Sequence, residues 1–294
     1  MIHKKVSYKD YYSNPDLIHR TGDIWKDLPS FGLLKGDVCR GLIITPACDL
    51  ANNKVETITF LPIITLNEYL VSRPFYSVLL KKIINLASSI NSRAVESLLN
   101  KNFLPSRESI KFIISEYEKL KYPGQSNRKN TEIIERIVHG LQLILDICSN
   151  NIIQVNKELL QKFISEKEYN DTKEKIIRNN FSSDLHFLPR DEQDPQWSAI
   201  LDHSVALFRY PITVSIEIMD TANDITIGNW NLKIDELREV FPMAIYFKNI
   251  CPVKVARLHD FFLSDLLTRF ATLYIRVGSP DFDSDTITRF SKQI

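Results

Sequence analysis

Two short apolar stretches, residues 41–45 and 57–64, constrain the fold of this chain more than any other feature. Both are rich in Ile, Leu, Thr or Phe, and Gly and Pro lie at or near their ends, a pattern that indicates β-strands. The polar segment between them predicts a short loop. Because a lone hairpin is marginally stable in water, we expect these strands to pair with others elsewhere in the chain.

A long helical region follows these strands. Apolar residues recur there with the 3.6-residue period over residues 67–101, 107–121, 131–147 and 156–178. Outside this region the residue pattern predicts strands over 22–25, 186–189, 206–218 and 240–249, a loop over 219–231 and a closing helix over 253–276.

This order of elements predicts an α+β fold. We expect the early and late strands to form one antiparallel sheet or small β-barrel, split by a helical insertion and packed by a C-terminal helix. The predicted division places the N-terminal part of the β domain at residues 1–66. The inserted helical subdomain then covers residues 67–183, and the rest of the β domain with the C-terminal helix covers 184–294.

Composition excludes several classes of protein. Lys and Arg number 37 and Asp and Glu 36, so overall charge does not favour a polyanionic partner. The chain has four cysteines, Cys39, Cys48, Cys148 and Cys251. They form no C-x-x-C pair and no His stands at a zinc-ligand spacing from them, so we expect no bound metal. So few cysteines in a chain of this length also predict a reducing cytoplasm. Without a glycine-rich phosphate loop, no cofactor is expected. No signal core or membrane-spanning apolar run is present, so no membrane partner is expected.

The loop between the two early strands carries a thiol beside a carboxylate, Cys48 and Asp49. As a nucleophile, Cys48 would need a base or a cation to lower its pKa, whereas the charge of Asp49 raises it. Lys54, His186 or His203 could supply that help. In the alternative interpretation, Cys48 packs beneath the loop and Asp49 caps it.

Two further groups are candidates for function. His203 follows an apolar stretch and could act as a general base, or could be an ordinary exposed histidine. Lys119, Lys121, Arg128 and Lys129 lie near two tyrosines, a combination that suits single-stranded nucleic acid. A solvated loop between helices is the alternative for this basic group.

Three motifs resemble the MazF/PemK toxin family: GDI at residues 22–24, RGLIIT at 40–45 and ITFLPIIT at 58–65. The resemblance implies an SH3-like β-barrel and metal-independent ribonuclease activity. It also implies catalytic roles for Arg40 and Thr65, which stand at the family's catalytic Arg and Thr.

The chain departs from that family pattern at two points. Arg40 is followed by Gly41, where the family has Pro, and an extra Ile separates Pro62 from Thr65. A shift of one residue turns a strand side chain to the opposite face. The alternative for Arg40 is a solvated or salt-bridged side chain.

A second resemblance covers both ends of the chain. TPACDL at residues 45–50, GDIW at 22–25 and the closing helix with Arg269 and Arg276 are similar to a set of uncharacterised bacterial proteins. Some of those proteins are encoded near phage-defence or mobile-element genes. The resemblance implies that the Cys48 loop and the closing helix belong to one domain.

These observations lead to one main functional hypothesis and one alternative. The main hypothesis is a cytoplasmic bacterial regulatory or sensing protein of a phage-defence or stress system, which binds a protein encoded nearby or a nucleic acid. The alternative is a MazF-like endoribonuclease toxin that uses Arg40 and Thr65. Thiol chemistry at Cys48 and assembly as a homodimer also stay open.

Overall fold

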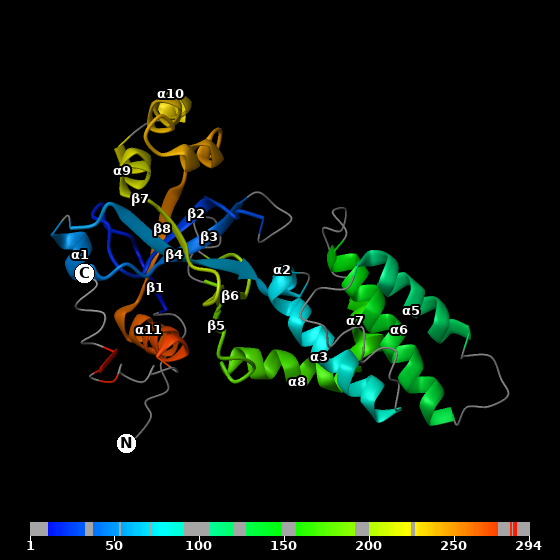
Figure 1. Ribbon diagram of the computed structural model, residues 1–294. Helices are drawn as coiled ribbons and strands as arrows, with labels where there is room; N and C mark the ends of the chain where they lie inside the picture. Colours follow the sequence, from blue (N-terminus) through cyan, green and yellow to red (C-terminus); the bar gives the residue numbers. More distant parts are fainter. Residues whose placement is uncertain are drawn as a thin grey trace, which may run out of the picture.

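The computed structural model describes residues 11–32, 38–52, 54–70, 72–90, 106–119, 128–148, 157–191, 200–224, 227–275, 283 and 285–286. It shows an α+β fold with one antiparallel sheet, a block of helices to one side and a helix near the C-terminus (Figure 1).

The described part of the chain contributes eight strands to this sheet. They are β1 (Tyr12–Ser13), β2 (Asp23–Pro29), β3 (Val38–Ile43), β4 (Thr57–Thr65), β5 (Leu185–Leu188), β6 (Ser204–Leu207), β7 (Ile212–Ser215) and β8 (Val253–Leu258). Their order in space is β1-β8-β2-β3-β4-β6-β5, and β7 also pairs with β4. Since the order does not return to β1, the sheet is open.

The helices within the described ranges fall into three groups. They are the short α1 (Ala47–Ala51) and α2 (Leu66–Tyr69), the block of α3 (Arg73–Ser89), α5 (Arg107–Lys119), α6 (Arg128–Cys148), α7 (Lys157–Ile164) and α8 (Glu166–Ile177), and the late α9 (Ile216–Asp224), α10 (Ile227–Leu237), η2 (Pro242–Phe247) and α11 (Asp260–Tyr274). None of these helices is both long enough and apolar enough to cross a membrane.

Strand β4 connects the early strands to the late ones. It pairs with β3 on one side, while on the other it pairs with β7 along its first half and with β6 along its second half. Strand β8 pairs with β2 at the other end of the sheet. The prediction that the early strands pair with later ones in an antiparallel sheet is therefore confirmed.

The two faces of the sheet pack into different cores, as the two-residue period of a strand requires. On β4, Leu61 and Ile63 join a core with Leu266 of α11. The alternate residues Phe60 and Ile64 face a larger core that continues into the helical block. Figure 1 shows this block extending away from the sheet beyond α2. The division of the chain into domains stays a prediction.

Side chains cover the end of the sheet at β5. The Tyr12 hydroxyl donates to the carbonyl of Pro189 at 2.7 Å, just after this strand. The amide of Phe187 donates to the Asn179 side chain at 2.6 Å. An uncovered edge strand invites pairing with another chain, so these contacts protect the sheet against it.

Three of the sequence-based predictions for the later elements are wrong. The stretch 206–218 is not one strand, since it contains the end of β6, a turn, β7 and the start of α9. Residues 219–231 are mostly helical rather than a loop, and 240–249 contain the 3-10 helix η2 rather than a strand. Short apolar stretches of this kind suit a buried helix as well as a strand, and packing decides between them.

The closing helix begins later than predicted. Residues 253–258 form β8, and α11 begins at Asp260, after His259 caps it by accepting from the amide of Phe261. The segment 46–52, predicted as a loop, contains the five-residue helix α1. In both places a helix and a strand follow each other closely, so neither the two-residue nor the 3.6-residue period extends over enough residues to be recognised.

Gly41 on β3 allows close packing beside Arg40. A Cβ added at this position would lie 2.4 Å from Cδ2 of Phe60 and 2.5 Å from Cδ1 of Leu28, both in the core. We expect Gly41→Ala to lower the free energy of unfolding by about 1–3 kcal/mol, as overpacking does. Urea unfolding measures the effect, with Lys81→Ala on the exposed face of α3 as control. An unchanged midpoint for Gly41→Ala would contradict this packing.

Candidate functional site

Arg40 lies in the middle of β3, where it faces Ile63 of β4 in the register of the sheet. Its side chain is half-buried, and its Nε is buried without a hydrogen-bond partner. No other described residue forms an ion pair or hydrogen bond with this guanidinium. An unpaired, partly buried guanidinium is costly unless a ligand or water satisfies it.

A hollow of about 210 Å³ lies beside this side chain, and we call it the Arg40 pocket. Its lining comes from β2, β3, β4, α2 and β6, and consists of Lys26, Asp27, Val38, Cys39, Arg40, Ile63, Thr65, Glu68 and Ser204. The structure thus brings together Arg40 and Thr65, the two residues to which the family resemblance assigned catalysis.

The polar groups of the pocket are partly engaged. The Thr65 hydroxyl accepts from the amide of Glu68 at 3.1 Å, and the Glu68 carboxylate accepts from the amide of Thr65 at 2.8 Å. This capping box starts α2 and holds the carboxylate in place. Lys26 has no ion-pair partner within the described residues. The pocket therefore presents two uncommitted cations, Arg40 and Lys26, to a ligand.

The thiol in this pocket is inert. Cys39 is buried, and burial together with the charge of Glu68 raises its pKa to about 12. A thiol with so high a pKa stays protonated at neutral pH and is a poor nucleophile. Its hydrogen bond to the carbonyl of Pro29, at 3.9 Å, is a structural contact.

Cys48 is exposed on α1, so the expectation that it packs beneath the loop is wrong. Its Sγ donates to Oδ1 of Asp49 at 3.5 Å. Asp49 stands in the first turn of α1, and its backbone carbonyl accepts from the amide of Lys54 at 3.1 Å.

His203 and Lys119, which were also predicted as functional residues, lie outside the Arg40 pocket. His203 is exposed, and its Nδ1 accepts from the amide of Arg190 at 3.0 Å, which ties two loops together. It does not line the Arg40 pocket. Lys119 is paired with Glu116 at 2.6 Å. Lys121 and the side chains of Arg128 and Lys129 lie outside the described residues, so the predicted nucleic-acid group stays a prediction.

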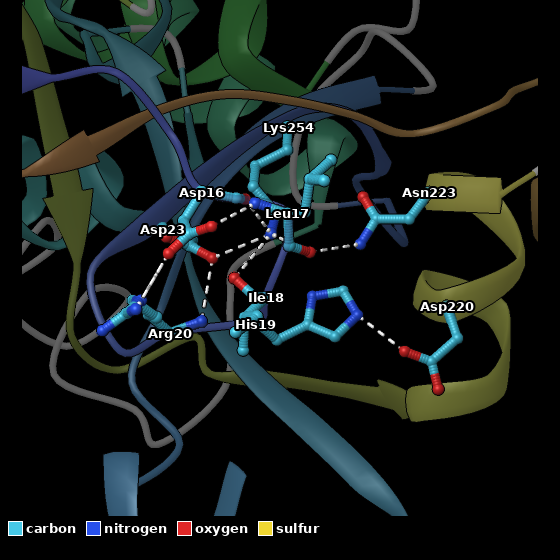
Figure 2. Close-up of polar contacts among 9 residues, drawn as sticks. All are labelled: Asp16, Leu17, Ile18, His19, Arg20, Asp23, Asp220, Asn223 and Lys254. Carbon is cyan, nitrogen blue, oxygen red and sulfur yellow. Dashed lines mark hydrogen bonds and ion pairs between the residues drawn. The ribbon is translucent and has the colours of Figure 1, made fainter. Parts of the chain in front are cut away.

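A second polar cluster was missed by the sequence analysis. Residues 16–20, which we call the strap, precede β2 and lie between Lys254 of β8 and the α9 residues Asp220 and Asn223 (Figure 2). The ammonium of Lys254 on β8 donates to three consecutive strap carbonyls, those of Asp16 at 2.9 Å, Leu17 at 3.3 Å and Ile18 at 2.9 Å. A single buried cation thereby fixes the path of the strap.

Asp23 is the counter-ion of this lysine. Its Oδ2 lies 3.2 Å from Nζ of Lys254, and the two side chains are 0% and 6% exposed. The same oxygen accepts from the amide of Arg20 at 2.9 Å. Burial raises the pKa of Asp23, because it outweighs the Arg20 hydrogen bond and the Lys254 charge.

The strap is also tied to α9. Nε2 of His19 and Oδ1 of Asp220 are 2.8 Å apart, and the side-chain amide of Asn223 donates to the carbonyl of Leu17 at 3.2 Å (Figure 2). Burial and the nearby Lys254 lower the pKa of His19, so it is neutral at pH 7. Its ring also lies beside Trp25, with the centroids 5.7 Å apart.

One sequence signal could have found this cluster. The GDIW motif places a carboxylate, Asp23, between a glycine and two residues that are fully buried, Ile24 and Trp25. Gly22 is required there because its φ is +92° and a Cβ would lie 2.8 Å from Leu263. An acidic residue within such a strand needs a buried partner. The partner could not be named, because Lys254 is more than 200 residues away.

The described residues contain no group of His, Cys, Asp and Glu side chains that could hold a metal ion. Neither protein-family models, nor curated proteins, nor solved structures include a match to this chain.

The Lys254–Asp23 pair generates a stability prediction. Lys254→Met removes the cation and leaves Asp23 as an unpaired buried carboxylate, which we expect to cost about 3–5 kcal/mol of unfolding free energy. The double variant Asp23→Asn/Lys254→Met carries no buried charge and should recover more than half of that loss. Urea unfolding of the three proteins measures the coupling. Equal losses in the single and double variants would contradict the pairing.

The same variant has a predicted pH dependence. Without Lys254 the pKa of Asp23 rises further, so the folded state binds a proton more tightly than the unfolded state. Stability is then greatest at low pH and falls as pH rises through the folded pKa. Relative to the wild type, Lys254→Met should regain stability when the pH is lowered from about 7 to about 5. A constant difference between the two proteins across this range would contradict this assignment.

The thiols should differ in reactivity. We expect Cys48 to react with a thiol reagent in the native protein at least about 100-fold faster than Cys39, which is buried and protonated. Cys48→Ser should remove this fast reaction, and denaturation in urea should expose Cys39. Mass spectrometry of the labelled peptides distinguishes the sites. Fast labelling of Cys39 in the native protein would contradict its burial.

Proposed function

We propose that this protein is a bacterial regulatory or sensing component that works by binding, and that the Arg40 pocket takes an anionic group of its partner. The observation that carries the proposal is the unpaired guanidinium of Arg40 beside Lys26, in a hollow also lined by the hydroxyl-bearing Thr65 and Ser204. Guanidinium groups bind phosphate and carboxylate oxygens in pairs.

The geometry supports binding better than catalysis. Glu68 is a carboxylate of the pocket that could act as a general base, but its Oε2 accepts a hydrogen bond from the amide of Thr65. The thiol of Cys39 is protonated, with its pKa raised to about 12. Asp27 is the other carboxylate of the lining, so the pocket holds two cations and two carboxylates, and we propose that the cations bind the anion without a base promoting its reaction.

We place this binding activity in a phage-defence or stress system in the cytoplasm, because some of the proteins with a similar TPACDL motif are encoded near phage-defence genes. The anionic group is the phosphate of a nucleic acid or a carboxylate of a protein encoded nearby. Both offer the paired oxygens that the Arg40 guanidinium accommodates.

A second candidate is MazF-like, metal-independent cleavage of RNA. One observation favours it, namely that Arg40 and Thr65 line the same pocket. In this candidate Arg40 stabilises the phosphate, and release of Glu68 from its capping box supplies the base. An SH3-like barrel belongs to the same resemblance and stays a prediction, since the described strands form an open sheet.

Binding and cleavage of RNA distinguish the two candidates. We expect a labelled single-stranded 12-mer RNA or an acidic peptide to bind the wild type, and Arg40→Ala to weaken that binding about tenfold through loss of a charged hydrogen bond. Fluorescence anisotropy at fixed salt measures the affinity. Gel analysis of the RNA in EDTA shows whether it is cut, and intact RNA supports binding alone.

Arg238→Ala is the matched control, since it removes an arginine with no ion pair among the described residues and does not line the pocket. Equal affinity of Arg40→Ala and Arg238→Ala would contradict the pocket as the binding site. RNA that is cut by the wild type in EDTA, and not by Arg40→Ala, would replace the proposal with the ribonuclease candidate.

A further inference from the structure

The strap exposes two large apolar side chains in a fixed position. Leu17 is 86% exposed and Ile18 is 60% exposed, although the backbone that carries them is bound by Lys254 and Asn223. Burying an ion pair to hold this segment is energetically expensive. Rigid presentation of apolar side chains to solvent is typical of a surface that a partner covers.

The surface beside the strap is hollowed, and its lining is part apolar and part polar. A hollow of about 290 Å³ is lined by the strap, by Leu50 of α1, and by Ile216 with three polar residues of α9. It shares Asp220 and Asp224 with a second hollow of about 370 Å³ that lies between α9 and α10. The two hollows together form a groove along α9.

The rim of this groove is acidic. Glu217, Asp220 and Asp224 are exposed and spaced so that they follow one face of α9. Within the described residues none of the three is paired with a lysine or an arginine, and the histidine partner of Asp220 is neutral at pH 7. The whole chain has a formal net charge of +1, so this face departs from the overall balance. Its field repels polyanions and attracts cations.

We propose that the strap and the acidic face of α9 form a docking surface for a basic amphipathic segment of a partner protein. The apolar side chains of that segment cover Leu17 and Ile18 and enter the hollow above Leu50. Its Lys and Arg side chains pair with Glu217, Asp220 and Asp224. This surface shares no lining residue with the Arg40 pocket, so the proposal is independent of the function proposed above.

A defined peptide tests the proposal. The probe is a fluorescein-labelled 18-residue helix built from Leu and Lys, and its affinity for the full chain is measured by anisotropy. We expect Leu17→Ser/Ile18→Ser to weaken binding at least about tenfold, through lost apolar contact. We expect Glu217→Lys/Asp224→Lys to weaken it by a similar factor, because the charge is reversed. Asp220 is left unchanged because it holds His19.

Matched variants elsewhere control for general effects. Leu232→Ser/Val240→Ser removes two other exposed apolar side chains, and Glu118→Lys/Asp171→Lys reverses two other exposed acids. Both controls should bind the probe as the wild type does. Thermal unfolding of every variant shows whether its fold is intact, which we expect since all of these side chains are exposed.

Two comparison peptides show whether binding needs both the positive charge and the apolar side chains of the probe. A Leu/Glu helix should not bind, and an all-Lys peptide should bind at least about tenfold more weakly than the Leu/Lys helix. The proposal is overturned if the target variants and the control variants bind the Leu/Lys helix equally well. It is also overturned if the wild type binds the all-Lys peptide as tightly as the Leu/Lys helix. Loss of RNA binding in Leu17→Ser/Ile18→Ser also overturns it, since the surface would then belong to a nucleic acid.

Discussion

The structure depends on the backbone hydrogen bonds of β4. This nine-residue strand pairs with β3 on one side and with both β6 and β7 on the other, so it joins segments that stand before and after the helical block. A lone hairpin of β3 and β4 would be marginal in water. The Arg40 pocket exists because of this pairing, since its lining comes from strands on both sides of the block.

The molecule presents two charged regions with opposite preferences. Within the described residues, the cations of the Arg40 pocket have no ion-pair partner, while the face formed by the strap and α9 carries carboxylates that pair with no lysine or arginine, beside exposed apolar side chains. The formal net charge of +1 does not reveal the acidic face, because it is a sum over the whole chain. Under the two proposals made above, one surface binds an anionic group and the other a basic segment, so the protein can hold two partners at once.

Much of the fold could be predicted from hydrophobic period, and much of the site could not. The early strands and most of the helices of the block are as expected, because their patterns are long or bounded by Gly and Pro. The predicted stretch 67–101 is instead divided into α2 and α3, and its residues 91–101 lie outside the described residues. The stretch from residue 206 to 258 was misassigned, because short apolar segments suit either conformation. For the site, the resemblance indicated Arg40 and Thr65, which do share a pocket, whereas Lys26, Glu68 and the strap were missed.

The sequence by itself determined the class of fold, the exclusion of nucleotide-loop motifs and the need for distant strands to pair. These follow from periodicity and composition, which are local properties of the chain. Only the tertiary structure decided that Asp23 meets Lys254 and that Arg40 has no partner among the described residues. The physical reason is that charge pairing depends on distances of a few ångströms between residues far apart in sequence, and no local pattern encodes those distances.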